Sequence, residues 1–426
     1  MSALVADVAV VGAGLAGLAA AWSAAECGAR VVLCERDPVV GGNVTAAHVH
    51  SLCGLYRSAD EGDALYAHPG LPRRFAEELR RSGAASAPER SGRVWVLPTF
   101  PPRVGEVALA RCGRLPALEL RPGCALVRAE LGKQAELGFA SDAAAWRALR
   151  AAVVIDASGD ACAAALAGAA LEAAPDASRQ RPSFIFRLAG VDAQIFEGFG
   201  RLHVTRAVAG AARGGELPAE CESVLVRRGA ESDEVYVTLN LPDFADQPFA
   251  PLDPRGLEAY GERARGLALE LVAFLARTRP AFAKARLLAW PRRVGVRETR
   301  RIQGLATVTR DDILLARRRD DEIALSTWPI ELWQDHRRAS FEYPAGASGI
   351  PLGALISRSH PRLAAAGRCL SASHEALGAL RVLGTALATG EAAGIAAALA
   401  ADRGCALAEI AAGEIRAYLE RHADRS

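Results

Sequence analysis

The chain has 426 residues, of which 51% are hydrophobic, and it balances 51 basic against 49 acidic side chains for a formal charge of +2. This composition is typical of globular proteins and excludes a disordered chain, and the near-neutral balance offers no broad basic surface for nucleic acid. The nine cysteines are scattered and lack a C-x-x-C pair, which argues against a disulfide framework and against a metal cluster.

An uncharged run from Val8 to Ala25 has the length of a membrane helix or the core of a signal peptide. It follows Asp7, contains three glycines and has no basic segment before it. A strand followed by a buried helix explains the same residues, so we expect no membrane segment and a cytoplasmic protein.

The first motif lies between a predicted strand, residues 6–11, and a predicted helix that reaches Glu26. Its glycines are Gly12, Gly14 and Gly17. The first fits a tight turn, the second a close backbone approach to a pyrophosphate, and the third close packing of helix on strand. A second strand, residues 30–34, ends at Glu35, about 20 residues beyond the glycines, where a ribose hydroxyl needs an acceptor. The pattern predicts a dinucleotide site, with the phosphates at the helix N-terminus.

The residues that follow Glu35 favour FAD over NAD. They read E-R-x-x-x-x-G-G-N-x-T and include Arg36, Gly41, Gly42 and Asn43. This segment resembles the extension found in the large FAD-binding superfamily that includes fumarate reductase flavoproteins. The resemblance implies that the glycine pair lies along the FAD, whereas the bare sequence also allows a purely structural turn.

The chain shows a second strand-end motif after the apolar residues 151–155. An abrupt polar stop follows, with Asp156, Gly159 and Asp160. It is similar to the D-A-T-G-D element of the same superfamily, with Ser158 in place of threonine. The resemblance implies cofactor contacts here, and a plain turn is the alternative.

Near the C-terminus a short strand, residues 363–366, leads through Gly367 and Arg368 into a helix-compatible run that reaches Leu399. The sequence A-G-R-C-L-S-A-S-H-E-A-L-G-A-L-R-V-L-G closely resembles the family called FAD-dependent oxidoreductases, and further matches extend from Ala6 to Gly394. The resemblance implies an α/β enzyme with a Rossmann-like FAD-binding domain of the glutathione reductase type. An interleaved substrate or cap domain with a mixed α+β sheet is expected beside it.

In such folds the second loop and helix lie against the isoalloxazine. We expect residues 378–384 to form this element, with Gly384 and the cation Arg381 placed to stabilise the negative charge of the reduced flavin. An internal ion pair is the alternative for Arg381.

The motifs divide the chain into two interleaved parts. We assign residues 1–55, 105–185 and 345–426 to the FAD-binding domain, and residues 56–104 and 186–344 to the cap. The cap segments predict a helix near 72–81, a proline-rich bend at 98–102, a longer helix at 257–277, and strands at 234–239, 286–290 and 323–327.

Candidate catalytic residues lie where the cap should meet the flavin. They are His48, His50 and Cys53 after the glycine pair, Arg297 and Arg300, Trp328 and Trp333, and His374 with Glu375. We predict proton transfer by His48, His50 or His374, and substrate binding by Arg297. Structural roles remain open for all of them. The resemblance to fumarate reductase flavoproteins also raises a covalent bond from His48, His50 or Cys53 to the flavin.

The leading hypothesis is hydride transfer between a small organic substrate and flavin N5, as in a dehydrogenase or oxidase. The alternative is an NAD(P)H-dependent flavin monooxygenase that acts on an organic or peptidyl substrate. A third reading is a protein that keeps FAD without chemistry. The expected partners are a small-molecule substrate and NAD(P)H or an external electron acceptor, without nucleic acid or membrane.

Overall fold

The computed structural model describes residues 4–58, 60, 62–140 and 148–423. A seven-stranded sheet lies at its centre, in the order β6-β2-β1-β9-β8-β7, with β20 paired to the second half of β9. Its strands are β1 (Leu4–Val11), β2 (Val31–Cys34), β6 (Leu118–Arg121), β7 (Ala125–Leu131), β8 (Ala135–Ala140), β9 (Ala148–Asp156) and β20 (Leu363–Ala365). The strands β6, β2, β1, β9 and β20 run parallel, whereas β7 and β8 form an antiparallel extension.

The register of the parallel strands brings the carboxyl ends of β1, β2 and β9 to one edge of the sheet. Val11 at the end of β1 pairs with Cys34 of β2 on one side and with Asp156 of β9 on the other. Because ligands of open α/β sheets bind outside the carboxyl ends of the strands, this edge is where a site is expected.

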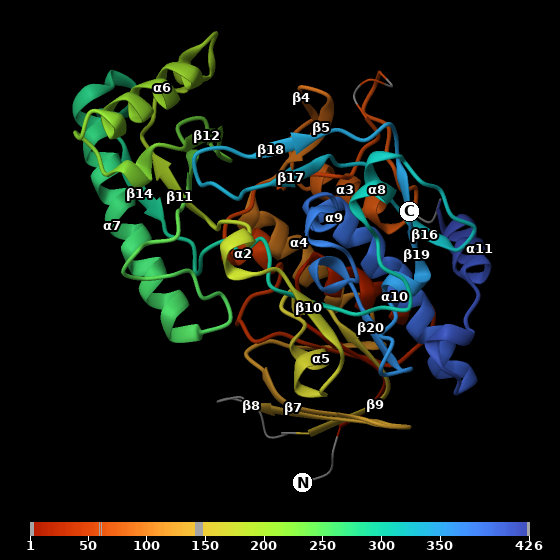
Figure 1. Ribbon diagram of the computed structural model, residues 1–426. Helices are drawn as coiled ribbons and strands as arrows, with labels where there is room; N and C mark the ends of the chain where they lie inside the picture. Colours follow the sequence, from red (N-terminus) through yellow and green to blue (C-terminus); the bar gives the residue numbers. More distant parts are fainter. Residues whose placement is uncertain (1–3, 59, 61, 141–147, 424–426) are drawn as a thin grey trace.

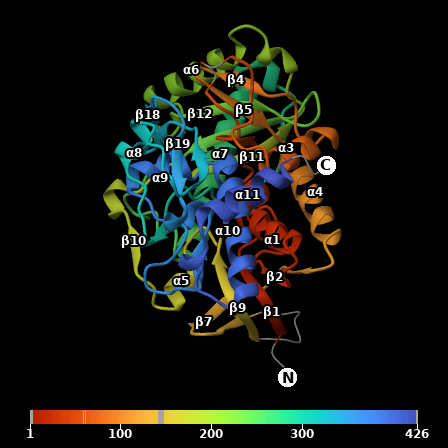
Figure 2. The same cartoon turned by 90° about the vertical axis from the view of Figure 1, so that its right-hand side faces the viewer.

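Two long helices, α1 (Leu15–Glu26) and α10 (Leu383–Arg403), pack closely on one face of this sheet. A Cβ atom added to Gly390 or Gly394 of α10 would lie 2.2 Å from a backbone oxygen of α1, so the small residues set the distance between the helices. Figure 2 shows them side by side. Within the described residues, α10 is the helix that is long and apolar enough to cross a membrane, and 89% of its apolar window is buried in this fold.

The cap has its own antiparallel sheet, ordered β12-β13-β11-β14. Its elements are β11 (Ser183–Ala189), α6 (Gly200–Arg213), β12 (Val224–Arg228), β13 (Val235–Asn240), α7 (Pro254–Thr278) and β14 (Arg286–Ala289). Helices α6 and α7 cover its outer side, at the left of Figure 1. A separate hydrophobic core reaches from Phe184 to Val296. The two layers confirm the predicted α/β fold with an interleaved sheet-based cap.

The remaining elements form small sheets and short helices around the central core. The strands are β3 (Ser51–Leu52), β4 (Glu89–Ser91), β5 (Val94–Pro98), β10 (Leu171–Ala173), β15 (Arg300–Ile302), β16 (Glu322–Ser326), β17 (Ile330–Leu332), β18 (Ser340–Glu342) and β19 (Ser348–Pro351). The α-helices are α2 (Asn43–Ala46), α3 (Leu71–Arg81), α4 (Pro101–Gly113), α5 (Cys162–Leu166), α8 (Arg310–Leu314), α9 (His374–Leu380) and α11 (Ala412–His422). The 3₁₀ helices are η2 (Asp176–Ser178), η3 (Ala193–Phe196), η4 (Ala219–Cys221), η5 (Pro280–Phe282), η6 (Leu352–Ala354), η7 (Gly367–Cys369) and η8 (Leu407–Glu409).

Three features depart from the predicted elements. The proline-rich bend at 98–102 instead opens α4, with Pro101 at its first turn, where a missing N–H costs nothing. The helix-compatible run that reaches Leu399 is broken at Arg381 and Val382 into α9 and α10. Apolar side chains of 56–104 and of 308–356 pack into the core of the central sheet. The separate core of the cap therefore includes fewer residues than the predicted cap segments.

Candidate functional site

A cavity of about 970 Å³ lies between the carboxyl edge of the central sheet and the cap sheet. Of the predicted site residues, the following line it: Gly12, Gly14, Glu35, Arg36, Gly41, Gly42, Asn43, His50, Gly159, Asp160, Arg297, Gly367, Arg368 and Arg381. The motifs that lie far apart in the sequence therefore meet at one cavity. We refer to the end formed by the central sheet as the sheet half and to the end under β11, β12 and β13 as the cap half.

The glycine turn after β1 forms the floor of the sheet half. Gly12 has a φ of 98°, and a Cβ atom there would lie 2.6 Å from the Ala157 carbonyl oxygen. A Cβ atom on Gly17 would lie 1.8 Å from the Gly12 oxygen. The turn is therefore pressed against the end of β9. It leads into the N-terminus of α1, which faces the cavity and has no side-chain cap. Free N–H groups at a helix start favour an anion.

Glu35 fixes this turn from the end of β2. Its buried carboxylate accepts the Ala13 N–H at 2.6 Å and the Asp37 N–H at 2.9 Å. Burial raises the pKa of Glu35, while these N–H donors act in the opposite direction. Since a carboxylate has further acceptor sites, Glu35 can both hold the turn and receive a ligand hydroxyl.

The glycine pair of the second motif lies directly on the glycine turn. Gly14 and Gly41 form a parallel bridge, and a Cβ atom on Gly42 would lie 2.7 Å from the Gly14 Cα. Asn43 follows and donates to the Val296 carbonyl at 3.1 Å. The pair therefore closes the sheet half against the strand-like segment before Arg297.

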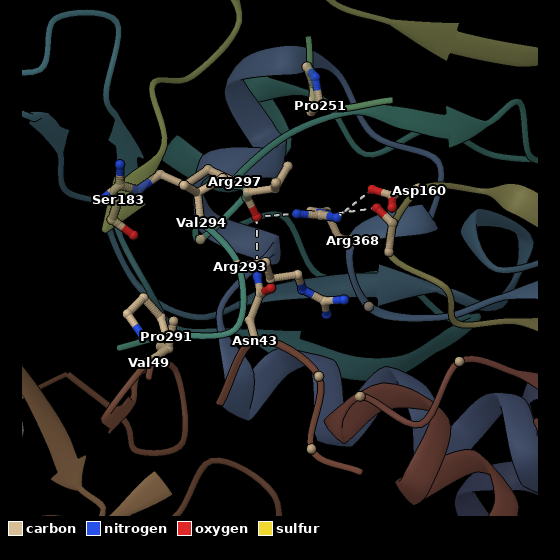
Figure 3. Close-up of a pocket in the computed structure, with 18 of the residues that line it drawn as sticks. Asn43, Val49, Asp160, Ser183, Pro251, Pro291, Arg293, Val294, Arg297 and Arg368 are labelled. Atoms are coloured by element: carbon tan, nitrogen blue, oxygen red, sulfur yellow. Dashed lines mark hydrogen bonds and ion pairs between the residues drawn. The ribbon is translucent and has the colours of Figure 1, made fainter. Parts of the chain in front are cut away.

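A polar network joins the third and fourth motifs, as Figure 3 shows. Arg368 donates to Asp160 at 2.7 Å and to the Gly159 carbonyl at 2.6 Å, and it also donates to the Val296 carbonyl that Asn43 contacts. Arg300 donates to the backbone carbonyl of Asp160 at 3.0 Å. These hydrogen bonds fix the side chains of Arg368 and Arg300 in this wall of the cavity.

The N-terminus of α10 faces the cavity, with Val382 and Leu383 in its wall and no side-chain cap. Arg381 precedes it, 3.7 Å from the carboxylate of Glu331. Glu331 also accepts the indole N–H groups of Trp328 at 2.9 Å and Trp333 at 2.6 Å. Although burial opposes it, the charge of Arg381 together with the indole donors lowers the pKa of Glu331. Arg381 therefore lines the cavity next to the start of α10 and also has an internal ion pair.

His50 is the predicted histidine that lines the cap half. Its ring stacks on Tyr236, with centroids 4.7 Å apart, and its Nδ1 lies 3.1 Å from the His48 carbonyl. Because a carbonyl only accepts, Nδ1 carries the proton, which leaves Nε2 as a free acceptor with no hydrogen bond to any residue that the structure describes. Burial lowers the pKa of His50 to about 4. Cys53 also lines the cavity, and burial raises the pKa of its thiol to about 12.

Arg297 occupies the same half in a fixed pose. It donates to the Asn240 amide oxygen at 2.7 Å and to the Arg181 carbonyl, and it stacks over Trp333 at 4.6 Å. Asn240 ends β13 of the cap sheet, and Trp333 directly follows β17. Residues from two different sheets therefore hold the Arg297 guanidinium in the cavity wall.

Five predicted residues lie behind the cavity wall: Gly17, His48, Asp156, His374 and Gly384. The Asp156 carboxylate is fully buried and holds its own turn through Ser158 and the Ala164 N–H. A Cβ on Gly384 would strike the backbone of Gly54 at 2.4 Å. These residues lie outside the lining of the cavity and support its wall from behind.

The two histidines behind the wall bind partners of the protein itself. The His48 Nδ1 lies 3.0 Å from the Ile185 carbonyl. The His374 Nδ1 lies 2.9 Å from the carboxylate of Glu298, which also pairs with Arg301. Their positions give no support to the predicted proton transfer by His48 or His374.

Sequence reasoning missed three residues of the cap half: Arg227, Asn240 and Glu331. Glu331 had a signal, since it lies between two tryptophans that were themselves singled out. Asn240 follows a predicted strand, where a polar residue often marks a site. Arg227 is one of two adjacent arginines at the end of β12, and adjacent residues of a strand point to opposite faces of the sheet. The sequence alone does not show which of the two arginines faces the cavity.

Comparisons with known proteins identify a family and similar folds. The family model described as FAD dependent oxidoreductase matches residues 7–419. A stretch of 41 residues is 56% identical to the fumarate reductase (cytochrome) of Shewanella frigidimarina, but it covers 10% of this chain and 7% of that protein. Among solved structures, p-nitrophenol 4-monooxygenase PnpA from Pseudomonas putida DLL-E4 has a TM-score of 0.51 at 12% identity, over 100% of this chain and 91% of that chain. PqsL of Pseudomonas aeruginosa, a probable FAD-dependent monooxygenase, reaches 0.46 at 15% identity, over 98% and 93% of the two chains.

Proposed function

The chain belongs to the family of FAD-dependent oxidoreductases, and from this premise we propose that it transfers a hydride between a small organic substrate and the flavin of FAD, as a dehydrogenase or oxidase. The cofactor and the enzyme class follow from the family. The type of reaction and the place of the substrate are the proposal. The observation that carries it is a neutral histidine with a free Nε2 in the same cavity as the fixed Arg297.

The residues of the sheet half fit FAD. The uncapped N-termini of α1 and α10 both open on the cavity, so one can hold the pyrophosphate and the other the pyrimidine edge of the flavin. Glu35 would accept from the ribose. A Cβ atom on Gly14 would have no described atom nearer than 3.8 Å, which leaves room for a ligand against this backbone. When bound, FAD supplies hydride acceptance and donation.

The protein supplies the proton transfer and the alignment. A pKa of about 4 keeps His50 neutral near pH 7, so its Nε2 accepts a proton as a substrate hydroxyl or amine is oxidised. Arg297, held by Asn240 and Trp333, orients the substrate without moving. Arg381 places a positive charge beside the N-terminus of α10, where both stabilise negative charge on the reduced cofactor.

The test is anaerobic mixing of the holoenzyme with NADH, NADPH and a panel of organic donors while the visible flavin band is followed. We expect the band to persist with the nicotinamides and to bleach with an organic donor. Rapid bleaching by NADH or NADPH alone would instead support the monooxygenase alternative, with NAD(P)H as a partner.

A variant separates the role of His50 from a general loss of structure. His50→Gln should slow bleaching by the organic donor by about 10²- to 10⁴-fold and leave FAD bound. His203→Gln, on the exposed face of α6, is the matched control and should react normally. Unchanged bleaching in His50→Gln would remove the proposed base.

A further inference from the structure

Three cations face the cap half of the cavity. We call Arg227, Arg297 and Arg381 the cap-side arginines, and all three line the cavity. Burial, and after it the charge of Arg381, lowers the pKa of Arg297 to about 9. Burial raises the pKa of Cys53, and the charges of Arg381 and Arg227 act in the opposite direction. Arg381 therefore lies near Arg297 and Cys53, and Arg227 lies near Cys53.

This charge is only partly balanced within the protein. Arg381 pairs with Glu331, whose oxygens also accept two indole N–H groups. The acceptors of Arg297 are the Arg181 carbonyl and the Asn240 amide, and both are neutral. Of these three guanidinium groups, Arg381 is thus the one that forms an ion pair within the described part of the chain.

Arg227 lacks even a neutral partner. Across the residues that the structure describes, its guanidinium has no hydrogen bond and no ion pair, and the exposed Glu89 acts on it through space alone. Burial lowers the pKa of Arg227. A half-buried cation without a partner is costly, and an anionic ligand removes that cost.

The sheet half shows the opposite arrangement. There Arg293 pairs with Asp37 at 2.7 Å, and Arg368 pairs with Asp160 at 2.7 Å. These two cations of the sheet half are therefore neutralised by carboxylates, unlike Arg227 and Arg297 in the half that receives the substrate. Trp333, Phe184 and Ile185 also line the cavity, and their apolar surfaces can contact the carbon skeleton of a substrate.

We propose that the substrate is a small organic carboxylate, anchored in the cap half by Arg227 and Arg297. The inference rests on the proposed function, because it places the anion in the cavity where His50 and the cofactor would act. Guanidinium groups match a carboxylate with two N–H donors, and two such groups fix both the position and the direction of the ligand.

The experiment is an equilibrium titration of the oxidised holoenzyme, followed by the visible flavin spectrum. The probes are acetate, benzoate and succinate, each compared with inorganic phosphate and with the neutral acetamide and benzamide. We expect saturable spectral changes with the carboxylates and none with the amides. Arg227→Gln should weaken the binding of the carboxylates at least tenfold and keep FAD, since Arg227 lies on β12 of the cap sheet, whose Val224 and Val226 pack into the separate core of the cap.

Arg228→Gln is the matched control. Arg228 is the next residue of β12, is exposed on the other face, and stacks over Phe196 at 4.3 Å. Its substitution should leave the dissociation constants unchanged. Equal binding of acids and amides, an unchanged constant in Arg227→Gln, or a response to phosphate alone would overturn the inference.

These outcomes are separate from a failure of the proposed function. Carboxylates that bind as expected but never reduce the flavin would refute the hydride transfer and keep the anion site. A neutral donor that bleaches the flavin equally in the wild type and in Arg227→Gln would keep the hydride transfer and refute the anion site.

Discussion

Replacement of Gly14 by alanine separates cofactor binding from folding. Gly14 begins α1 with φ −69° and ψ 174°, a backbone conformation that alanine adopts freely. The added methyl group would meet no described atom nearer than the Gly42 Cα at 3.8 Å, yet it would stand at the cavity surface, where the helix start should receive the pyrophosphate. The variant should therefore fold normally and bind FAD poorly.

The magnitude follows from the contacts that a methyl group would block. Displacing the pyrophosphate removes one or two hydrogen bonds to charged oxygens, a loss of about 2 to 4 kcal/mol. Since about 1.4 kcal/mol corresponds to a tenfold change, the dissociation constant for FAD should rise roughly 30- to 1000-fold. The apoprotein itself should gain about 0.4 to 1 kcal/mol of unfolding free energy, because alanine restricts the unfolded chain.

Fluorescence titration of the apoprotein with FAD and urea unfolding of the same samples measure the two quantities. Gly17→Ala is the contrasting variant, since its methyl group would lie 1.8 Å from the Gly12 oxygen and should lower stability by about 1 to 3 kcal/mol or more. Gly210→Ala, in open surroundings on α6, is the control and should leave FAD binding unchanged. A wild-type affinity in Gly14→Ala would refute the placement of the phosphates at α1.

Three further predictions concern charge and attachment. Arg381→Ala should lower the reduction potential of the bound flavin in spectroelectrochemistry, and an unchanged potential would leave Arg381 with its structural pair to Glu331 alone. Burial lowers the pKa of His68 to about 4, below its unfolded value, so the unfolded chain takes up the proton first as the pH falls. This residue alone should contribute about 2 kcal/mol to the stability lost from pH 7 to pH 5, so in urea unfolding His68→Gln should lose about that much less than the wild type over the same range. Acid precipitation should release all flavin into the supernatant, because burial keeps the thiol of Cys53 protonated and we assign the free nitrogen of His50 to the substrate. Yellow colour retained in the pellet would show a covalent bond.

The parts of the site that the sequence predicts are those that local backbone rules determine. The strand, glycine turn and helix around Gly12 and the acceptor at Glu35 follow from short-range patterns, because each unit must satisfy its own turn and helix start. The break between α9 and α10 follows from distant contacts instead. The N–H of Gly384 donates to the Cys53 carbonyl at 2.8 Å, and a Cβ on Gly378 would lie 2.9 Å from the Glu331 oxygen. No pattern within residues 374–399 contains those partners.

The same reasoning explains the histidines. His48, His50 and His374 look alike in the sequence, since each lies near a cofactor motif. In all three the Nδ1 is engaged, by the Ile185 carbonyl for His48, the His48 carbonyl for His50 and Glu298 for His374. They differ because His50 lines the cavity and the other two do not. Which side chain reaches the cavity is a property of tertiary packing, so spacing along the chain cannot reveal it.

The division of the cavity has a consequence for how substrate choice can change. The sheet half is built from turns pressed against one another at Gly12 and Gly42, and its Arg293 and Arg368 pair with carboxylates of the protein. The cap half presents side chains of β12 and β13, whose other faces pack into a separate hydrophobic core. A substitution at Arg227 therefore alters the charge that a substrate meets without disturbing the turns that hold FAD. Selection on the cap strands can thus exchange one substrate class for another while the cofactor chemistry stays intact.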